Sequence, residues 1–492
     1  MRLAGCHVGD VASATEALDR ANRWCLSGLT GLNQDILQKR RSAEEFAADL
    51  AALVLADLPA PEVFTSRQAQ QLLVILGLAG ASVGRHYQEA DEGRRATPER
   101  AFVGLRVGGD EPFTQYFRRL AEHSGTGHGD RDTFASLVRW NLPGAEVERG
   151  GTVLCSLPSA FDDGLVRSYT GAGDEMRFFG LLKASEALER AANAELMPLS
   201  DGLIDLSGVE ALERISRASI LVDALRELSS DFAARPPAEG LQIPHFMDVF
   251  RQFAVHWTIG DIPPSGALDP ESLIRDLLLG IDLPSYPDHL RQVSPGLLDS
   301  EREVLNRLLD RDSLPRLVLA EAGVDPALLE DLSPKSLYFL TEKHPALAAL
   351  YFLLNAHARF AGGHLRLSKH FLFDPQRSRE TAGLGDPGVV SNRAGTTGMD
   401  ESRLEMLTRV RHHHLLTPLR AIPAPMLHAV AEPQGPTRWT DEPPVLVRFT
   451  GTELGPYELG LPDQSHLHRL RHLTHLIVAE GVVPRHTSSG AA

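Results

Sequence analysis

Hydrophobic residues recur at every third or fourth position through long stretches of this chain. This spacing is that of an amphipathic α-helix, whose apolar stripe faces a core. It predicts helices over eight segments: residues 43–58, 66–82, 174–197, 209–232, 245–257, 271–281, 298–309 and 346–373. We therefore predict a mainly α fold.

Strand and loop signals are fewer. The alternation Val-Leu-Val-Arg-Phe at residues 445–449 is the best candidate strand, and we expect it to pair near residues 456–461. Polar and glycine-rich clusters at residues 91–100, 123–132 and 375–399 predict loops. The third is long for a compact helical protein, and long loops of this kind are often lids or disordered segments.

The distribution of these elements predicts three regions. Residues 1–150 form a smaller N-terminal helical region, and residues 151–416 form the main helical domain. From about residue 417 proline becomes frequent and the helical periodicity fades. We therefore expect residues 417–492 to form an irregular C-terminal appendage.

Composition limits the partners and the compartment. With 492 residues, 43% of them hydrophobic, the chain is long enough to enclose a sizeable cavity. Its formal net charge of −16 repels phosphate backbones and anionic lipid surfaces, so we expect neither nucleic acid nor a membrane as a partner. The three cysteines form no CxxC pair, and no stretch of about 18 apolar residues is present. These features predict a cytoplasmic protein without disulfides.

His364 is the residue with the most informative position. It lies near the end of the helix predicted over residues 346–373, directly after Gly362 and Gly363. An imidazole there can serve as the axial ligand of a buried iron, and the glycine pair would leave room for a flat macrocycle beside it. A lone histidine on an apolar helix is more often a core residue than a metal ligand. The residues around His364 must therefore distinguish between these two interpretations.

Asp276 is the single acidic residue within the otherwise apolar segment 273–281. A carboxylate in such a position is costly unless it is paired. A metal-bound histidine usually donates its second N–H to a carboxylate, so Asp276 is the natural partner of His364. The alternative is that Asp276 faces solvent or pairs with Arg275.

Several blocks, taken together and in order, resemble the indoleamine 2,3-dioxygenase superfamily. These are helical, histidine-ligated heme proteins that include the tryptophan-rearranging enzyme of pyrrolnitrin biosynthesis. The proximal-helix block of the family is matched by His364-Leu365 and Lys369-His370-Phe371, with His370 in place of an aromatic residue. The resemblance implies a helical bundle around a heme pocket, with heme b as cofactor and His364 as the iron ligand.

A second block is similar to the family's Gly/Ser-rich turn and the Asp-Val-Leu-Leu-Gly-Ile helix that follows it. Residues 263–267 match the turn and residues 276–281 match the helix. The resemblance places Ser265 at the distal, catalytic serine, with Gly266 beside the cofactor. It places Asp276 at the aspartate that holds the proximal histidine.

A third block, residues 246–251, resembles the family segment that grips the substrate. Arg251 is the implied clamp for the amino-acid carboxylate, because a guanidinium fork matches a carboxylate bidentately. Phe246 and Met247 would contact the indole, with Met247 replacing one of the family's aromatic residues. Without the other blocks, Arg251 could equally well be interpreted as an arginine on the surface of a helix.

Two further blocks complete the implied pocket. Residues 177–198 resemble the helix that carries the distal phenylalanine, which places Phe178 over the substrate; Leu182 stands where many members have a serine. Residues 395–398 resemble the Gly-Thr-Gly-Gly closing loop, which places Thr396 near the substrate ammonium. Taken alone, this last block would be interpreted as a turn between helices.

The resemblance implies a heme-dependent oxygenase that inserts oxygen from O2 into tryptophan or a related aromatic amino acid. An unidentified reductant would keep the iron ferrous. The changes at Leu182 and Met247 favour an alternative, an oxidative rearrangement or hydroxylation of a modified aromatic amino acid in secondary metabolism. A third alternative is a helical scaffold that has lost the heme and has no catalytic activity.

Overall fold

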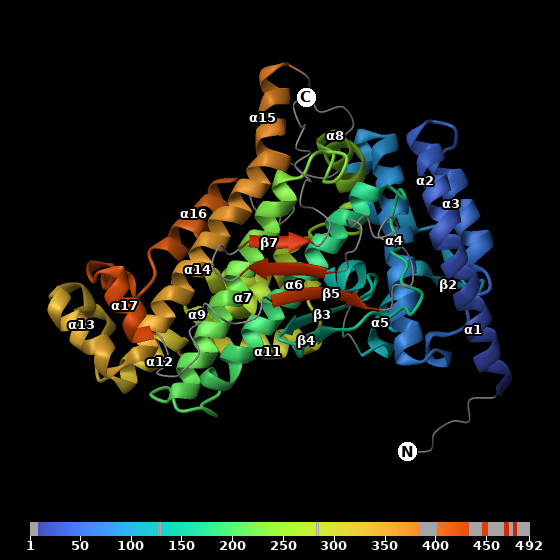
Figure 1. The fold of residues 1–492 in the computed structure, drawn as a ribbon. Helices are drawn as coiled ribbons and strands as arrows, with labels where there is room; N and C mark the ends of the chain where they lie inside the picture. The colour runs from blue at the N-terminus through green and yellow to red at the C-terminus, as the bar shows by residue number, and fades with distance from the viewer. Residues whose placement is uncertain are drawn as a thin grey trace, which may run out of the picture.

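The computed structural model confirms that the protein is mainly helical (Figure 1). It describes residues 8–125, 127, 129–281, 283, 285–383, 401–431, 445–450, 467–471 and 476–479. Within this part of the chain, no helix is both long and apolar enough to cross a membrane.

Three long helices form the centre of the molecule: α6 (Gly173–Ser200), α7 (Val209–Ala234) and α14 (Pro345–Ser368). Helix α7 packs against both α6 and α14, and all three bury leucines and alanines along the contacts. The predicted segments 174–197 and 209–232 are thereby confirmed almost to the residue. The predicted segment 346–373 is α14 together with the π-helical turn that follows it, Lys369–Phe373.

A second group of helices lies beside this centre, at the N-terminal side (Figure 1). It comprises α1 (Val8–Arg23), α2 (Thr30–Leu37), α3 (Ala43–Leu50) and α4 (Ser66–Ala90). Helix α4 begins at a capping box in which Thr65 and Gln68 each satisfy a backbone N–H of the other. The predicted helices at residues 43–58 and 66–82 correspond to α3 with its π-helical extension and to the first two thirds of α4.

Shorter helices complete the described structure: α5 (Phe113–His123), α8 (Ile243–His245), α9 (Pro270–Leu279), α10 (Tyr286–Val293), α11 (Asp299–Leu309), α12 (Leu314–Glu321), α13 (Pro334–Lys343), α15 (Asp374–Thr381), α16 (Glu401–His412) and α17 (Ala424–Ala431).

Two of the predicted segments differ from the structure. The segment 245–257 is not one α-helix but a run of short turns, with a π-helical turn at Phe246–Phe250 and a 3-10 turn at Arg251–Phe253. The segment 375–399, predicted as a loop, begins with helix α15. Its Pro375 sits in the first turn, where a missing N–H breaks no helical hydrogen bond.

An antiparallel sheet of five strands crosses one face of α6 and α7, in the order β4-β3-β5-β6-β7. The strands are β3 (Gly144–Arg149), β4 (Thr152–Leu157), β5 (Val445–Thr450), β6 (Leu467–Arg471) and β7 (Leu476–Ala479). A two-stranded ribbon, β1 (Arg106–Val107) and β2 (Glu111–Pro112), lies apart from it.

Strand β5 confirms the strand predicted at residues 445–449, but its partners are β3 and β6. The predicted partner segment, 456–461, lies outside the described residues. Because β5 pairs with β3 from Gly144↔Thr450 to Arg149↔Val445, this part of the C-terminal region belongs to the central sheet and is no irregular appendage.

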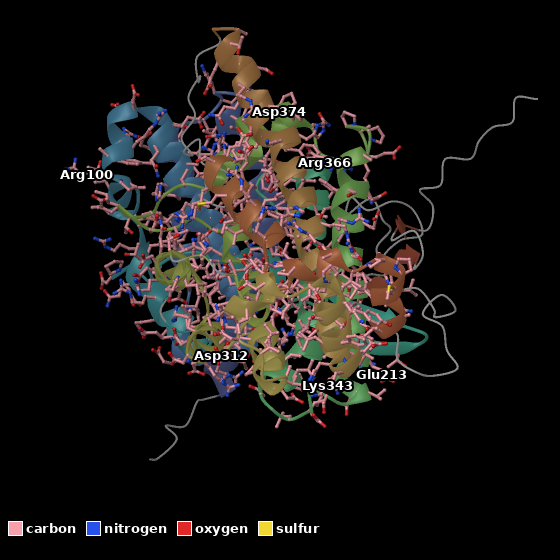
Figure 2. The ribbon with its side chains drawn as sticks, turned by 90° about the vertical axis from the view of Figure 1, so that its left-hand side faces the viewer. Arg100, Glu213, Asp312, Lys343, Arg366 and Asp374 are labelled. Carbon is pink, nitrogen blue, oxygen red and sulfur yellow. The ribbon has the colours of Figure 1, made fainter. Side chains whose placement is uncertain are left out.

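Charged side chains cover the outside of the molecule. Figure 2 labels six of them: Arg100, Glu213, Asp312, Lys343, Arg366 and Asp374. The polar groups that are buried are therefore the ones that call for an explanation, and many of them surround one cavity.

Candidate functional site

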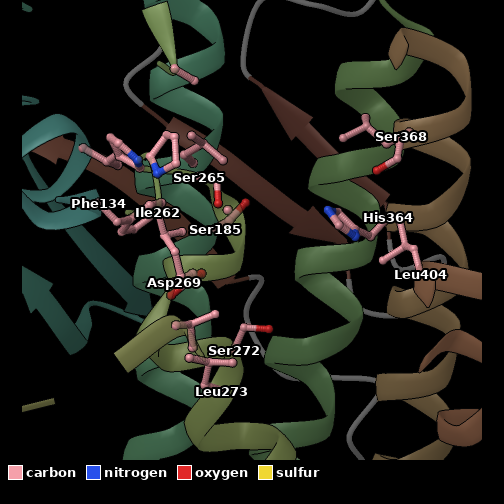
Figure 3. Close-up of a pocket in the computed structure, with 18 of the residues that line it drawn as sticks. Phe134, Ser185, Ile262, Ser265, Asp269, Ser272, Leu273, His364, Ser368 and Leu404 are labelled. Atoms are coloured by element: carbon pink, nitrogen blue, oxygen red, sulfur yellow. The ribbon is translucent and has the colours of Figure 1, made fainter. Parts of the chain in front are cut away.

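A cavity of about 580 Å³ lies between helices α6, α9, α14 and α16 and the segment of residues 246–266. This volume falls within the range of about 300–1,000 Å³ that is usual for ligand pockets. Figure 3 shows Ser185, Ser265, Asp269 and Ser272 on one side of it, with His364 on the other.

Helix α6 supplies one wall. Phe178, Leu182, Ser185 and Glu189 line the cavity at spacings of four, three and four residues, which is one face of a helix. Phe178 meets two further aromatic rings of the wall, Phe246 at 5.4 Å and Phe250 at 5.6 Å between centroids. The end of the cavity near Phe178 is therefore aromatic, whereas Glu189 adds a polar group to the same wall.

Helix α14 supplies the wall that carries His364. The ring of Phe360 lies 6.2 Å from the His364 ring, and both side chains line the cavity. The neighbouring glycines do not face it: a Cβ on Gly362 would meet His412 of α16, and a Cβ on Gly363 would meet Arg226 of α7. The expectation that these glycines clear space for a macrocycle is wrong, because successive helical residues point about 100° apart.

The imidazole of His364 is neutral and open to the cavity. Burial and the nearby Arg411 guanidinium lower its pKa to about 4. Among the described residues, none makes a hydrogen bond to either of its ring nitrogens. A neutral imidazole keeps a lone pair with which it can bind a metal ion.

Asp276 lines the same cavity but is bonded to a different histidine. Its Oδ1 accepts a hydrogen bond from Nε2 of His357 at 2.8 Å, and no hydrogen bond joins it to His364 within the described part of the chain. His357 precedes His364 by seven residues, so the two share one face of α14 but lie about 10 Å apart along its axis. The predicted pairing of Asp276 with His364 is not formed, and neither is the alternative pairing with Arg275.

Asp276 is the centre of a buried polar network. Arg411 of α16 donates to both its oxygens, at 3.1 Å from Nε and 2.6 Å from Nη2. The hydroxyl of Tyr286 donates to Oδ2 at 2.7 Å. The Arg411 guanidinium and the hydrogen bond from His357 hold the pKa of Asp276 well below its usual range, despite its burial.

The network continues to Glu189 through Arg275. The Nε of Arg275 donates to Nδ1 of His357 at 3.2 Å, and its Nη2 donates to Glu189 at 2.9 Å. Since Nδ1 of His357 is an acceptor, its proton lies on Nε2, where it is donated to Asp276. The chain of contacts ties α6, α9, α14 and α16 together around the cavity.

The wall opposite His364 is polar. Four residues line it. Ser265, Gly266 and the N-cap Asp269 precede α9, and Ser272 lies in its first turn. The Oγ atom of Ser265 is buried and has no hydrogen-bond partner among the described residues. A buried hydroxyl without a partner is unusual, and it marks a place where a ligand group can bind.

The structure brings most of the residues predicted for the substrate to this cavity. Phe178, Phe246 and Arg251 line it, and Arg251 is only 6% exposed, so it is not a helix-surface arginine. Met247 is buried but does not line the cavity; on the π-helical turn it points elsewhere, and Phe250 takes part instead. Thr396 lies outside the described residues.

Several cavity residues were missed by the sequence reasoning. Ser185 lies one helical turn after Leu182 on the same face, so it brings a hydroxyl to the cavity wall beside Leu182. Helical spacing alone would have found it. His357 is at a helical spacing from His364 and was detectable in the same way.

Comparisons of this chain with protein-family models and with curated proteins found no match. The likeness to the indoleamine 2,3-dioxygenase superfamily is therefore a likeness of short sequence blocks.

The buried histidines predict how stability depends on pH. Burial lowers the pKa of His357 to about 4, whereas the unfolded value is about 6.5. The unfolded chain therefore binds more protons between these values, so the free energy of unfolding should fall as the pH drops from about 6.5 towards 4, by about 1.4 kcal/mol per pH unit for this residue. Urea unfolding at pH 7, 6 and 5 measures the slope. His357→Asn should reduce it, and an unchanged slope would contradict the assignment.

Proposed function

We propose that the protein is a heme-dependent oxygenase that inserts oxygen from O2 into tryptophan or a related aromatic amino acid. The observation that carries the proposal is the neutral imidazole of His364, which faces a large cavity and has no hydrogen-bond partner among the described residues. His364 would hold the iron of heme b. When bound, ferrous heme supplies the activation of O2.

Three features of the cavity support a heme there. Its volume suits a large ligand. His364 is unprotonated at neutral pH, as a metal ligand must be. The orphaned hydroxyl of Ser265 lies on the wall opposite His364, where it can bond a group bound between them. Asp276 does not take part as the family motif implies, because its carboxylate is occupied by His357, Tyr286 and Arg411.

The remaining wall suits an aromatic amino acid. Arg251 would bind the substrate carboxylate with a charge-assisted hydrogen bond, which fixes its orientation. Phe178, Phe246 and Phe250 form an aromatic slot for the indole ring and exclude water from it. Thr396 would contact the ammonium group, as the sequence resemblance implies.

Absorption spectroscopy and a turnover assay test the proposal together. Purified protein with added hemin should show the Soret band of histidine-ligated heme, and the ferrous form should consume L-tryptophan with O2. A heme spectrum without tryptophan turnover would favour the second candidate, rearrangement or hydroxylation of a modified aromatic amino acid. The presence of Leu182 in the cavity wall favours that candidate. The absence of any heme spectrum would support the third alternative, a helical scaffold without heme or catalytic activity.

Replacing Arg251 by Met should weaken substrate binding more than catalysis. Loss of a charged hydrogen bond costs about 1.5–3 kcal/mol, so the KM for the amino acid should rise roughly ten- to a hundredfold with a smaller change in kcat. Tryptamine, which lacks the carboxylate, is the matched control substrate. Equal effects on both substrates would exclude a carboxylate clamp.

A further inference from the structure

A histidine and an aspartate form a hydrogen-bonded pair where the cavity meets the solvent. Nδ1 of His256 lies 2.7 Å from Oδ1 of Asp261, and both residues line the cavity. The side chain of His256 is 44% exposed, whereas that of Asp261 is 13% exposed. Figure 3 shows Ile262, the residue after Asp261, on the side of the cavity that carries Ser265, opposite His364.

The carboxylate of Asp261 is fixed in place by three further donors. Its Oδ2 accepts from the backbone N–H groups of Trp257 at 2.8 Å and Thr258 at 3.1 Å, and from Nη1 of Arg131 at 3.0 Å. Although burial alone would raise it, the pKa of Asp261 is held below its usual range by the hydrogen bond from His256 and by the Arg131 guanidinium. An ionised carboxylate only accepts hydrogen bonds, so the proton of the neutral His256 ring lies on Nδ1 and the lone pair on Nε2.

The N-terminal helices hold the backbone of this pair. The backbone carbonyl of His256 accepts from the side-chain amide of Gln88 on α4 at 2.8 Å. Trp257 is 1% exposed, and its ring lies 5.3 Å from that of Phe117 on α5. It also packs on Gly80 of α4, where a Cβ would lie 2.4 Å from the indole ring. The orientation of the imidazole is therefore set before any ligand binds.

The second ring nitrogen of His256 is open. Among the described residues, none makes a hydrogen bond to Nε2, and no serine, threonine or cysteine side chain in this part of the chain is bonded to the ring. The pair is therefore not arranged to activate a nucleophile of the protein, as a hydrolytic triad is. Its lone pair can instead accept a hydrogen bond from a group bound in the cavity, and the carboxylate behind the imidazole makes it a better acceptor.

The charges around the pair favour a cation. Arg131 is shared between Asp261 and Asp132, whose Oδ1 accepts from its Nη2 at 2.7 Å. Burial raises the pKa of Asp132, and Arg131 counteracts this effect. With both carboxylates ionised and the imidazole neutral, one guanidinium faces two negative charges. A positively charged N–H donor matches such a site better than a neutral one, because hydrogen bonds to charged groups are stronger.

We propose that the His256–Asp261 pair binds the ammonium group of the ligand, with Nε2 of His256 accepting one of its N–H groups. Arg251 lies five residues earlier and lines the same cavity, so one segment offers a cation and an acceptor to the two charged ends of an amino acid. An ammonium has three N–H groups, so a contact with Thr396 is compatible with this role. The inference rests on the proposed function in taking an amino acid as the ligand, but not in taking heme as the cofactor. The sequence blocks assign no role to the pair.

Two ligands that differ in the ammonium group test the proposal. L-Tryptophan and indole-3-propionate share the indole ring and the carboxylate, and calorimetric titration at pH 7.5 should show that the protein binds L-tryptophan more tightly. In His256→Phe the affinity for L-tryptophan should fall roughly tenfold or more, as expected for a lost hydrogen bond to a charged group. The affinity for indole-3-propionate should change little. His370→Phe alters an exposed histidine and is the matched control, which should bind both ligands as the wild type does.

The pH dependence of binding gives a readout that a purely structural histidine would not change. Histidine gains its proton near neutral or weakly acidic pH, and an imidazolium repels an ammonium. Between pH 7.5 and pH 5.5 the preference of the wild type for L-tryptophan over indole-3-propionate should therefore decrease. His256→Gln has an amide oxygen that accepts but does not titrate, so it should keep part of the preference and lose its dependence on pH.

The titrations are made with and without added hemin, which separates this inference from the proposed function. If hemin does not bind, the heme-dependent function fails, while the two ligands still decide whether the pair binds an ammonium. Three results would overturn the assignment: a wild type that does not bind L-tryptophan in preference to indole-3-propionate, an undiminished preference in His256→Phe, or equal losses for both ligands in that variant.

Discussion

Replacing His364 by Ala is expected to abolish the spectrum of histidine-ligated heme. His357, the other cavity histidine of α14, is not expected to replace it, because both of its ring nitrogens are engaged, one with Asp276 and one with Arg275. Mutating even the outer partners of a metal ligand costs about 10–100-fold in affinity or activity, so loss of the ligand should cost more than about 100-fold. Titration of the purified variant with hemin, followed by absorption, measures the loss.

Two controls make this result specific. His370→Ala removes an exposed histidine from the turn that follows α14 and should leave the spectrum unchanged. His357→Asn tests the competing histidine, and it should retain the heme spectrum while lowering stability. If the spectrum survives in His364→Ala, His364 does not bind the iron, and the central observation behind the proposed function is lost.

The central helices were predictable because they are long and strongly periodic. Helices α6, α7 and α14 each repeat apolar residues over six or more turns, and no tertiary contact overrides such a pattern. The hairpin of β3 and β4 was missed although the sequence carries its signal. Gly150 and Gly151 have φ values of 57° and 80°, as the two-residue turn between twisted strands requires, and a Gly-Gly pair is typical of that turn.

The partners within the site were less predictable than its residues. The sequence identified His364, Asp276, Ser265 and Arg251, and all four line the cavity. It did not reveal which histidine Asp276 binds, because periodicity gives the face of a helix but not the height at which a neighbouring helix crosses it. The contact of Arg275 with Glu189 depends in the same way on where α6 and α9, which lie far apart in the sequence, cross each other.

Replacing Asp276 by Asn is expected to lower the free energy of unfolding by about 3–5 kcal/mol. The Asp276 side chain is 2% exposed and is the only carboxylate that Arg411 contacts at hydrogen-bond distance in the described structure. Without it the Arg411 guanidinium would remain charged in a site largely shielded from water. Urea unfolding of the protein without heme, at pH 7, measures the change.

A double-mutant cycle and an exposed pair serve as controls. Arg411→Met alone should also destabilise the protein, but adding it to Asp276→Asn should cost much less than the sum, because the two residues share one interaction. Asp248→Asn breaks a more exposed ion pair with Arg379, at 2.7 Å, and should cost no more than about 1 kcal/mol. Additive losses at positions 276 and 411 would show that they are not coupled.

The same carboxylate should govern unfolding in acid. Because its pKa in the folded protein lies well below the unfolded value of about 3.9, Asp276 contributes its full stability above that value. The contribution is lost as the pH falls below about 4, where the unfolded chain takes up a proton that the folded protein does not bind. In Asp276→Asn this part of the acid dependence should disappear, while the part between pH 6.5 and pH 4, which comes from buried histidines, should persist. If the free energy of unfolding of the variant falls below pH 4 as it does in the wild type, Asp276 is not the charge that Arg411 and His357 stabilise.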